Sequence, residues 1–236
     1  MNLADQGRIL QVRAPAINFY VLRDQEELYL IDAGFIGGLR RMKRALVRRC
    51  WDRFPIRGII VTHGHLDHIF NVKTIARRYG AWIAAPRLDA DQYAGRSNYP
   101  GRARVAQWLE TVGRPLLGFQ RFTPDRLLDD GDMLDVWQGL QAVHLPGHTA
   151  GHMGFYSPER RLLFSGDLFV SYRKAARLPP DIFNSHPEQI PASVAAALHL
   201  ELDGVLPNHC DPSSPAEHLR RFRLLGAKLA SSPSRD

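Results

Sequence analysis

Apolar residues fall in short runs along the chain, and most runs have the length and composition of β-strands. Turn or polar residues separate the runs, and the one that ends at Thr62 is almost continuously apolar, as expected of a buried strand. A second set of runs follows in the latter half of the chain. The predicted strands cover residues 9–12, 17–22, 28–31, 57–62, 82–85, 134–137, 140–145, 153–156, 162–164 and 204–206.

Helical spacing of apolar residues predicts helices between these strands. In a helix over residues 40–51, Leu39, Met42, Leu46 and Cys50 would share one face, so Cys50 is expected in the core. Gly80 stands where a helix over 67–79 would end. Further helices are predicted at 105–112, 188–199 and 215–229.

Strands and helices are mixed in both halves, which predicts an α/β fold: two sheets packed together with helices on the outer faces would bury these runs. At 236 residues the chain has the length of one domain, and we expect a single domain over 1–236. The stretch 86–126 is rich in Gly, Pro and Arg around residues 97–104. We expect this stretch to be an insertion over the active site.

Composition narrows the class of protein. Hydrophobic residues make up 44% and charged residues 23%, which is typical of a globular domain. No apolar run is long enough for a membrane-spanning helix, and the first residues show no secretory signal, so no membrane partner is expected. With two cysteines there is no disulfide framework, and a reducing cytoplasm is the expected location. The net charge of +7 favours a solvated basic surface over a specific site.

The strongest chemical signal is the run from Thr62 to His68, which follows a predicted buried strand and begins a helix. It contains three imidazoles and a carboxylate within six residues. Imidazole suits zinc, and a carboxylate adds a harder oxygen ligand. Residues i and i+2 of an extended segment point the same way, so His63 and His65 can reach one metal ion together. Asp67 and His68 can turn toward a second ion as the helix begins.

Further candidate ligands follow other predicted strands. His144, His148 and His152 come after one strand, Asp167 follows Ser-Gly after another, and His209 follows a third. Each polar residue lies just after an apolar run, where loops converge on one rim of a sheet.

Taken together, these residues resemble the metallo-β-lactamase superfamily, which includes glyoxalase II, lactonases, ribonuclease Z and persulfide dioxygenases. The matching pieces are Asp32 in Leu-Ile-Asp-Ala-Gly, the H-x-H-x-D-H run at 63–68, His148 in Pro-Gly-His-Thr, Asp167 in Ser-Gly-Asp, and His209. They occur in the family's order. The resemblance implies a four-layer αββα sandwich of two mixed β-sheets, with metal ions at one edge between the sheets.

The resemblance also implies a binuclear site. One ion would be held by His63, His65 and His148, the other by Asp67, His68 and His209, with Asp167 bridging both. Two Zn²⁺ ions are expected, with Mn²⁺ or Fe²⁺ as alternatives. A bridging water or hydroxide would be the nucleophile, since two neighbouring cations lower its pKa and stabilise a developing oxyanion.

Further roles are implied for residues around the ions. Asp67 would also orient the water as a catalytic residue, and Asp32 would hold the ligand loop. Thr149 and His152 would support the site. Histidines 144, 186, 199 and 218 fit no ligand position. Cys210, beside His209, is expected to be a small buried thiol.

The ligand pattern predicts a hydrolase that cleaves a small ester, thioester or lactone. Glyoxalase II is similar, but only 27 residues follow His209, so its helical extension for glutathione is not expected here. Acyl-homoserine lactonases carry a Tyr shortly after the bridging Asp, which makes Tyr172 a candidate catalytic residue. A positive rim would favour a small polar or anionic acyl substrate. The predicted rim residues are Arg87, Arg96, Arg102, Arg104, Arg173, Lys174 and Arg177.

The alternative is a nucleic-acid-processing phosphodiesterase of the ribonuclease Z kind. Seven basic residues lie in the segment 40–53, and such a stripe could contact phosphates. The Pro-Gly-His-Thr-Ala-Gly-His form of the motif at 146–152 resembles the glyoxalase and lactonase branch more closely. Nucleic acid is therefore not the expected partner, and the oligomeric state stays open.

Overall fold

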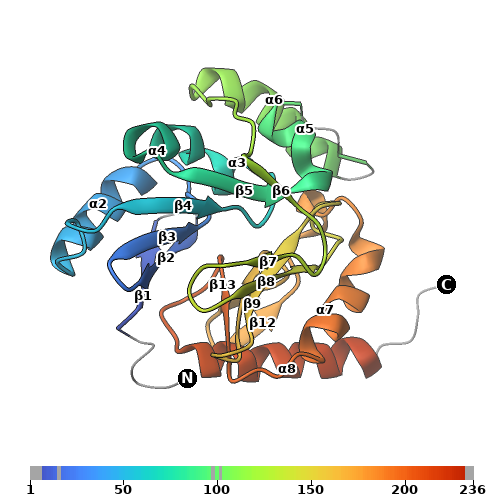
Figure 1. Ribbon diagram of the computed structural model, residues 1–236. Helices are drawn as coiled ribbons and strands as arrows, with labels where there is room; N and C mark the ends of the chain where they lie inside the picture. The colour runs from blue at the N-terminus through green and yellow to red at the C-terminus, as the bar shows by residue number, and fades with distance from the viewer. Residues whose placement is uncertain (1–6, 15–16, 97–98, 101–102, 232–236) are drawn as a thin grey trace.

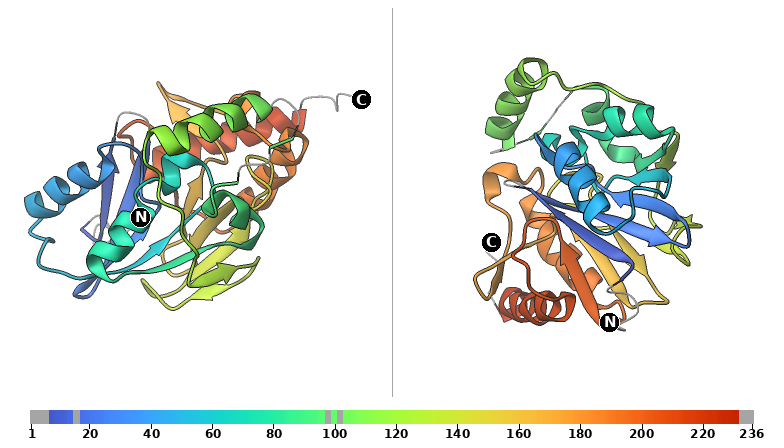
Figure 2. Two further views of the ribbon diagram at one scale, coloured as in Figure 1. Left: turned by 90° about the horizontal axis from the view of Figure 1, so that it is seen from above. Right: turned by 90° about the vertical axis from the view of Figure 1, so that its left-hand side faces the viewer.

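The computed structural model describes residues 7–14, 17–96, 99–100 and 103–231. Two large sheets pack face to face, and helices cover their outer sides (Figures 1 and 2). The expected sandwich of two mixed sheets with outer helices is confirmed. The expected single domain over 1–236 includes residues outside the described ranges.

The first sheet has six strands in sequence order. Its first three strands pair antiparallel, as adjacent hairpins do, and the later pairs are parallel. The strands are β1 (Ile9–Arg13), β2 (Asn18–Asp24), β3 (Glu27–Ile31), β4 (Ile56–Ile60), β5 (Trp82–Pro86) and β6 (Arg126–Leu128). Because β3 and β4 run parallel, Asp32 and the loop after β4 leave the sheet at the same edge.

The second sheet has five strands in the order β13-β10-β9-β8-β7. Only the pair of β10 with β13 is parallel. The strands are β7 (Met133–Leu134), β8 (Leu140–His144), β9 (Met153–Ser157), β10 (Leu162–Gly166) and β13 (Gly204–Pro207). A separate hairpin of β11 (Val170–Tyr172) and β12 (Ala175–Arg177) follows β10.

Three apolar clusters separate four layers. The outer face of the first sheet packs against α2 (Gly38–Arg48) and α4 (Val72–Tyr79), through Met42 and Ile75 among others. Tyr20 and Phe164 belong to the cluster between the two sheets. A third cluster joins the second sheet to α7 (Ile190–Leu198) and α8 (Pro215–Ser231), where the rings of Phe169 and Phe222 stack at 4.3 Å. Burial of these faces is the main stabilising contribution to the fold.

The prediction that Cys50 lies in the core is wrong. Helix α2 ends at Arg48, so Cys50 follows it with a φ of 55° and is exposed, while the next residue, Trp51, is buried. Helical spacing therefore held for Met42 and Leu46 but did not extend one turn further.

Two other elements differ from their predicted bounds. The helix expected over 67–79 is two helices, α3 (Leu66–Ile69) and α4, and Asn71 lies between them. The Asn71 amide donates hydrogen bonds to three carbonyl groups of residues 33–35, which anchors the chain at this break. The strand expected over 134–137 stops at Leu134, because Trp137 enters a turn with a φ of 53°.

The segment 86–126 lies beside the first sheet, and its Tyr93 and Phe122 pack in the same apolar cluster as α2 and α4. It contains α5 (Ala90–Tyr93) and α6 (Arg104–Leu116), and its last residue begins β6. Helix α6 lies at the top of Figure 1. Short 3-10 turns occur at Arg87–Asp89, Asp181–Phe183 and Pro187–Gln189. Within the described part of the chain, no helix has both the length and the apolar character needed to cross a bilayer.

Candidate metal centre

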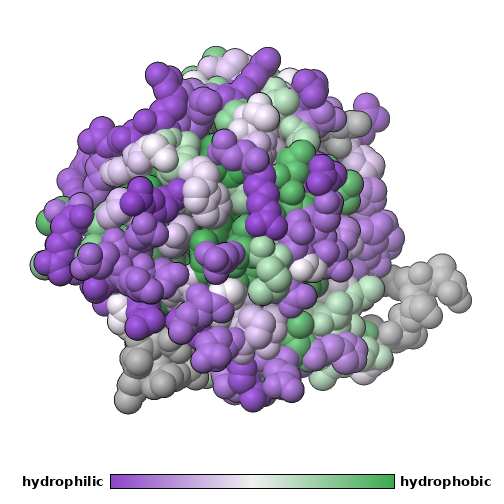
Figure 3. Space-filling view, viewed as in Figure 1, coloured by the Kyte–Doolittle hydropathy of each residue, from purple (hydrophilic) through white to green (hydrophobic). Residues whose placement is uncertain are grey.

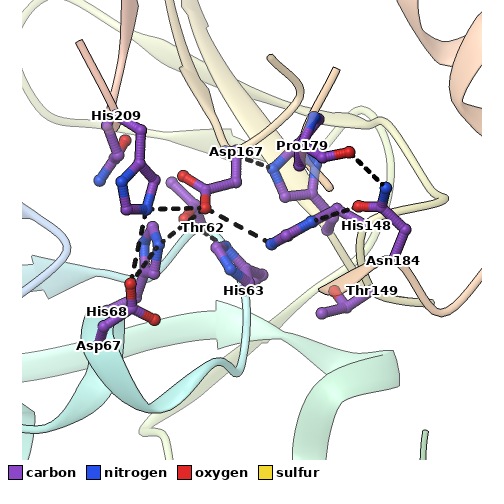
Figure 4. A network of polar contacts seen from close by, with 12 residues as sticks. Thr62, His63, Asp67, His68, His148, Thr149, Asp167, Pro179, Asn184 and His209 are labelled. Atoms are coloured by element: carbon purple, nitrogen blue, oxygen red, sulfur yellow. Dashed lines mark hydrogen bonds and ion pairs between the residues drawn. The ribbon is translucent and has the colours of Figure 1, made fainter. Parts of the chain in front are cut away.

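The predicted ligand side chains come from loops that follow four strands. His63, His65, Asp67 and His68 follow β4, and His148 follows β8. Asp167 and His209 directly follow the parallel strands β10 and β13, whose carboxyl ends lie side by side. The two sheets thus bring residues from across the chain to one edge between them (Figure 4).

All seven predicted ligands lie in three overlapping groups whose donor atoms are within 4.8 Å of one another. These groups are His63 with His65 and His148, His63 with His68 and Asp167, and Asp67 with His68 and His209. Asp167 is central, since its Oδ2 atom lies 3.1 Å from His209 Nε2, 3.4 Å from His68 Nε2 and 3.5 Å from His148 Nε2.

The donor atoms fit a metal ion. The Nε2 atoms of His63, His65, His68 and His148 and the Oδ1 atom of Asp167 are buried without a hydrogen-bond partner. Leaving such groups unpaired in a protein interior is costly, so their convergence marks a place for a cation. Imidazole and carboxylate together suit Zn²⁺, Fe²⁺ or Mn²⁺.

Three of these imidazoles are held by their other nitrogen. His68 Nδ1 lies 2.8 Å from Asp32, His148 Nδ1 lies 2.8 Å from Asn184, and His63 Nδ1 lies 3.0 Å from the Thr62 hydroxyl. When Nδ1 donates in this way, Nε2 points into the site, where it can bind a cation once it carries no proton. That arrangement is typical of metal-binding histidines, whose second nitrogen fixes the ring and its tautomer.

Electrostatics divide the cluster into two halves. Burial lowers the pKa of His65 to about 4 and that of His148 to about 3, and it lowers the pKa of His63 well below the usual range. These three imidazoles are therefore neutral at pH 7, which is the form that binds a metal ion.

The other half carries the carboxylates. Burial by itself lowers the pKa of His68, but the charges of Asp167, Asp32 and Asp67 outweigh it and raise the value to about 10. Burial likewise opposes the shift of Asp67, but His68 and His209 bring its pKa down to about 2. Asp67 thus stays ionised at neutral pH.

Asp32 joins several parts of the site. Its buried carboxylate accepts hydrogen bonds from the Thr62 backbone and hydroxyl at 2.8 Å, from His68 and from the Asn208 amide at 2.7 Å. These contacts tie the ends of β3, β4 and β13 together. Asp32 lies where the resemblance placed it, holding the ligand loop.

Asp89 joins two ligand loops, and sequence reasoning missed it. Its buried carboxylate accepts hydrogen bonds from Gly64 N at 2.8 Å, Thr149 Oγ1 at 2.7 Å and Gly151 N at 2.8 Å. A side chain on Gly151 would come within 2.7 Å of this carboxylate, which explains the glycine. The sequence feature that could have indicated Asp89 is its position, three residues after the end of strand β5.

His152 and Asn184 complete the support of the ligands. His152 accepts a hydrogen bond at Nε2 from Asp167 N at 3.0 Å, and its Nδ1 donates to the Leu145 carbonyl at 2.9 Å. Burial lowers the pKa of His152 to about 3, so it remains a neutral acceptor. Asn184, which no motif had indicated, accepts from His148 and donates to Pro179 O at 2.9 Å.

The remaining candidates lie outside the cluster. Tyr172 is 45% exposed on β11 and does not line the cavity described below. Cys210 is buried, as expected, and its thiol contacts Gln11 and the Pro207 carbonyl. Histidines 144, 186, 199 and 218 belong to none of the metal-binding groups found among the described residues.

A cavity of about 500 Å³ opens onto the cluster. Five of the candidate ligands line it, together with Glu110; these ligands are His65, Asp67, His148, Asp167 and His209. Its walls are mostly apolar. They come from the loop before α2, from α3 and α6, and from the segment 170–183. The apolar wall residues are Phe35, Leu66, Leu109, Gly113, Leu117, Val170, Pro179, Pro180 and Phe183.

The prediction of a positive rim is wrong for the described residues, since no Arg or Lys among them lines the cavity. Arg87 and Arg96 instead form ion pairs with Asp129 and Asp91 at 2.8 and 2.7 Å. Arg102 lies outside the described residues. The basic side chains of 40–53 also lie away from the cavity, on the hydrophilic surface at the left of Figure 3.

Comparisons with known proteins agree with this geometry. A family profile described as the metallo-beta-lactamase superfamily matches residues 12–206. The probable metallo-hydrolase YflN of Bacillus subtilis is 28% identical over 222 residues, which cover 86% of this chain and 82% of the relative.

Two other relatives are matched over less of their own length. A hydroxyacylglutathione hydrolase of Rhodobacter capsulatus is 27% identical over 77% of this chain and 64% of its own. The bovine acyl-coenzyme A thioesterase MBLAC2 is 28% identical over 64% of this chain and 57% of its own. The chain thus spans less than two thirds of either protein.

Solved structures share the fold. A metallo-beta-lactamase family protein of Thermus thermophilus, TTHA1429, superposes with a TM-score of 0.68 at 20% identity, covering 94% of this chain and 79% of that one. A di-iron-bound form of TTHA1623 gives a TM-score of 0.66 at 25% identity, covering 91% and 98%.

Proposed function

The chain belongs to the metallo-beta-lactamase superfamily, and we propose that it is a metal-dependent hydrolase of small acyl esters, thioesters or lactones that uses two metal ions. The observation that carries the proposal is the convergence of seven imidazole and carboxylate side chains, five of which line a largely apolar cavity. The relatives named as a hydroxyacylglutathione hydrolase and an acyl-coenzyme A thioesterase support the same bond class.

Two ligand groups would hold the ions. His63, His65 and His148 offer one set of nitrogen donors, and Asp67, His68 and His209 offer the other. Asp167 Oδ2 contacts members of both sets, so its carboxylate is placed to bridge them. Bound divalent cations would polarise the substrate carbonyl and lower the pKa of a water molecule. Zinc is the proposed metal, with iron or manganese as alternatives that suit the same donors.

Asp67 is the proposed proton acceptor. Its side chain is 32% exposed where it lines the cavity, whereas the Asp167 side chain is 7% exposed. Its pKa of about 2 keeps it ionised, so at neutral pH it can accept a hydrogen bond from water and orient it. The remaining residues of the site hold the ligands and exclude solvent.

The apolar walls determine the kind of substrate. No Arg or Lys of the described chain lines the cavity, and Glu110 does, so an anionic acyl group has no basic side chain to pair with along these walls. An aliphatic or otherwise apolar acyl group gains free energy by leaving water for such walls. We therefore revise the proposed substrate from a polar acyl compound to one whose acyl part is apolar.

A substrate panel tests this function. Metal-loaded protein is assayed with acyl thioesters, acyl lactones, lactoylglutathione and bis(p-nitrophenyl) phosphate, and metal content is measured by elemental analysis. Asp167→Asn is the inactive control, because it removes the carboxylate shared by both ligand sets. Acyl ester or thioester cleavage with close to two metal ions per chain supports the proposal. Cleavage of the phosphodiester alone, or a metal content that stays near one after supplementation, would refute it.

A further inference from the structure

Helix α6 presents two neighbouring rows of side chains toward the site. Leu109, Gly113 and Leu117 recur every four residues and line the cavity. Glu110 and Arg114, each one residue further along, contact the metal-ligand loop, and Glu110 also lines the cavity. One helix therefore forms a wall of the cavity and also braces the loop that carries His63 and His65.

The brace sets the position of the wall. Glu110 Oε1 accepts a hydrogen bond from Leu66 N at 3.1 Å, and its other oxygen is paired with Arg114 at 2.6 Å. The buried Arg114 guanidinium also donates to the Gly64 carbonyl at 3.3 Å and to Gln92 O. Because these contacts hold α6 against the ligand loop, its cavity-facing row lies at a defined distance from the reacting centre.

Gly113 leaves a gap in that row. A Cβ atom built there would make ordinary van der Waals contacts with Leu117 Cδ1 at 3.9 Å and Leu66 Cδ2 at 4.0 Å, so a small side chain would fit without a clash. Its φ is not positive, so the backbone does not require glycine at this place. Glycine within a helix is normally unfavourable relative to alanine. Neither backbone conformation nor crowding explains this residue, whereas the space that it leaves in the cavity wall does.

We infer that Gly113 determines specificity for acyl chain length: an aliphatic acyl chain passes through the gap between Leu109 and Leu117 while its carbonyl lies at the ligand cluster. This inference rests on the proposed function and deepens it. The acyl chain would contact the α6 row on one side and Phe183 across the cavity on the other. The substrate class is therefore a thioester or ester of a linear aliphatic acid.

Substitution of the glycine tests the inference. Gly113→Leu fills the gap, and its kcat/KM for a series of acyl thioesters of N-acetylcysteamine, from acetyl to dodecanoyl, is compared with the wild type. Each methylene group that loses its apolar contact costs about fourfold, so long chains are expected to lose at least about tenfold. The acetyl thioester is expected to lose less than the dodecanoyl thioester, because it has fewer methylene groups whose apolar contacts can be lost. Thr111→Leu places the same leucine side chain at an exposed position of α6 outside the cavity and leaves the profile unchanged.

A second variant and a binding measurement make the result independent of folding and of turnover. Leu117→Phe narrows the same gap from a 41% exposed position, where a larger ring does not disturb the core. Binding of sodium decanoate, followed by calorimetry, requires no hydrolysis and is expected to weaken at least about tenfold in both variants. Unchanged chain-length profiles and decanoate binding in both variants would overturn the role of Gly113. Decanoate binding that depends on residue 113, without cleavage of any acyl substrate, would refute the proposed hydrolase function and leave the acyl site standing.

Discussion

Asp32→Asn removes one charge at the point where three strand ends are tied together. The Asp32 carboxylate accepts four hydrogen bonds, three of them at Oδ2 from Thr62 Oγ1, His68 and Asn208, and one at Oδ1 from Thr62 N. Asparagine keeps the three contacts if its oxygen takes the place of Oδ2. Its amide nitrogen then faces the Thr62 N–H, donor against donor. Asp32 has a φ of 62°, which asparagine tolerates better than alanine. The substitution therefore changes the side-chain hydrogen bonds without adding backbone strain.

The expected magnitude follows from this count. A buried hydrogen bond to a charged group contributes about 1.5–3 kcal/mol, and leaving its donor unpaired adds a cost of the same order. The three retained contacts are also weaker, because their acceptor is neutral. The free energy of unfolding should therefore fall by about 2–4 kcal/mol. His68 loses its carboxylate partner at Nδ1, and such a loss typically lowers metal affinity about 10- to 100-fold.

Two measurements on the same variant check this reasoning. Urea unfolding of the metal-free protein gives the stability, and competition with a chelator gives the affinity for each ion. We expect the ion held by Asp67, His68 and His209 to be released more readily than the other. Asp125→Asn is the matched control, because the Asp125 carboxylate accepts a hydrogen bond from Ile83 N at 2.8 Å and lies away from the ligand loops. A destabilised Asp32→Asn protein that binds both ions as tightly as the wild type would show that Asp32 braces the strands without tuning the ligand.

Three further substitutions separate roles within the molecule. Asp67→Asn is expected to lower kcat about a hundredfold or more with a smaller change in KM, since it removes the proton acceptor; full activity at full metal content would exclude that role. Tyr172→Phe should keep kcat/KM within about twofold because Tyr172 does not line the cavity, and a large fall would return its hydroxyl to the mechanism. Asp211→Asn tests pH dependence. Burial opposes the shift, but hydrogen bonds from Ser213 and Arg221 lower the pKa of Asp211 to about 2, below its ordinary value of 3.8. Its stabilising contribution is therefore present above about pH 4 and lost as the pH falls toward 2, so the stabilities of wild type and variant should converge over that interval; a constant difference would contradict the assignment.

The clustering of the candidate metal ligands was predictable, because each of them comes shortly after a predicted strand. His63 and Asp167 follow apolar runs directly, and the ends of parallel strands meet at one edge of a sheet. Asp32 follows β3 in the same way. For such residues, local pattern and sheet geometry suffice, and ligand chemistry restricts the residue types to imidazole and carboxylate.

The residues that support the ligands could not be found by the same reasoning. Asp89 reaches Gly151 across 62 positions of sequence, and Asn184 reaches His148 across 36. Asp and Asn are also common in turns, so their types alone carry little information. Only the folded chain shows that each satisfies a donor in another ligand loop.

The cavity wall shows why the basic residues of the sequence did not predict which side chains line the cavity. Arg87 and Arg96 belong to the segment that covers the site, but each is paired with a nearby carboxylate and neither faces the cavity. The helix in that same segment turns Leu109, Gly113 and Leu117 inward, because Glu110 and Arg114 hold the adjacent row against the ligand loop. The net charge of +7 is a property of the whole chain. Which side chains line the cavity depends instead on which row of α6 is held against the ligand loop. The substrate preference that we propose for this chain therefore depends on a tertiary contact of α6 and on residues such as Gly113 that carry no charge.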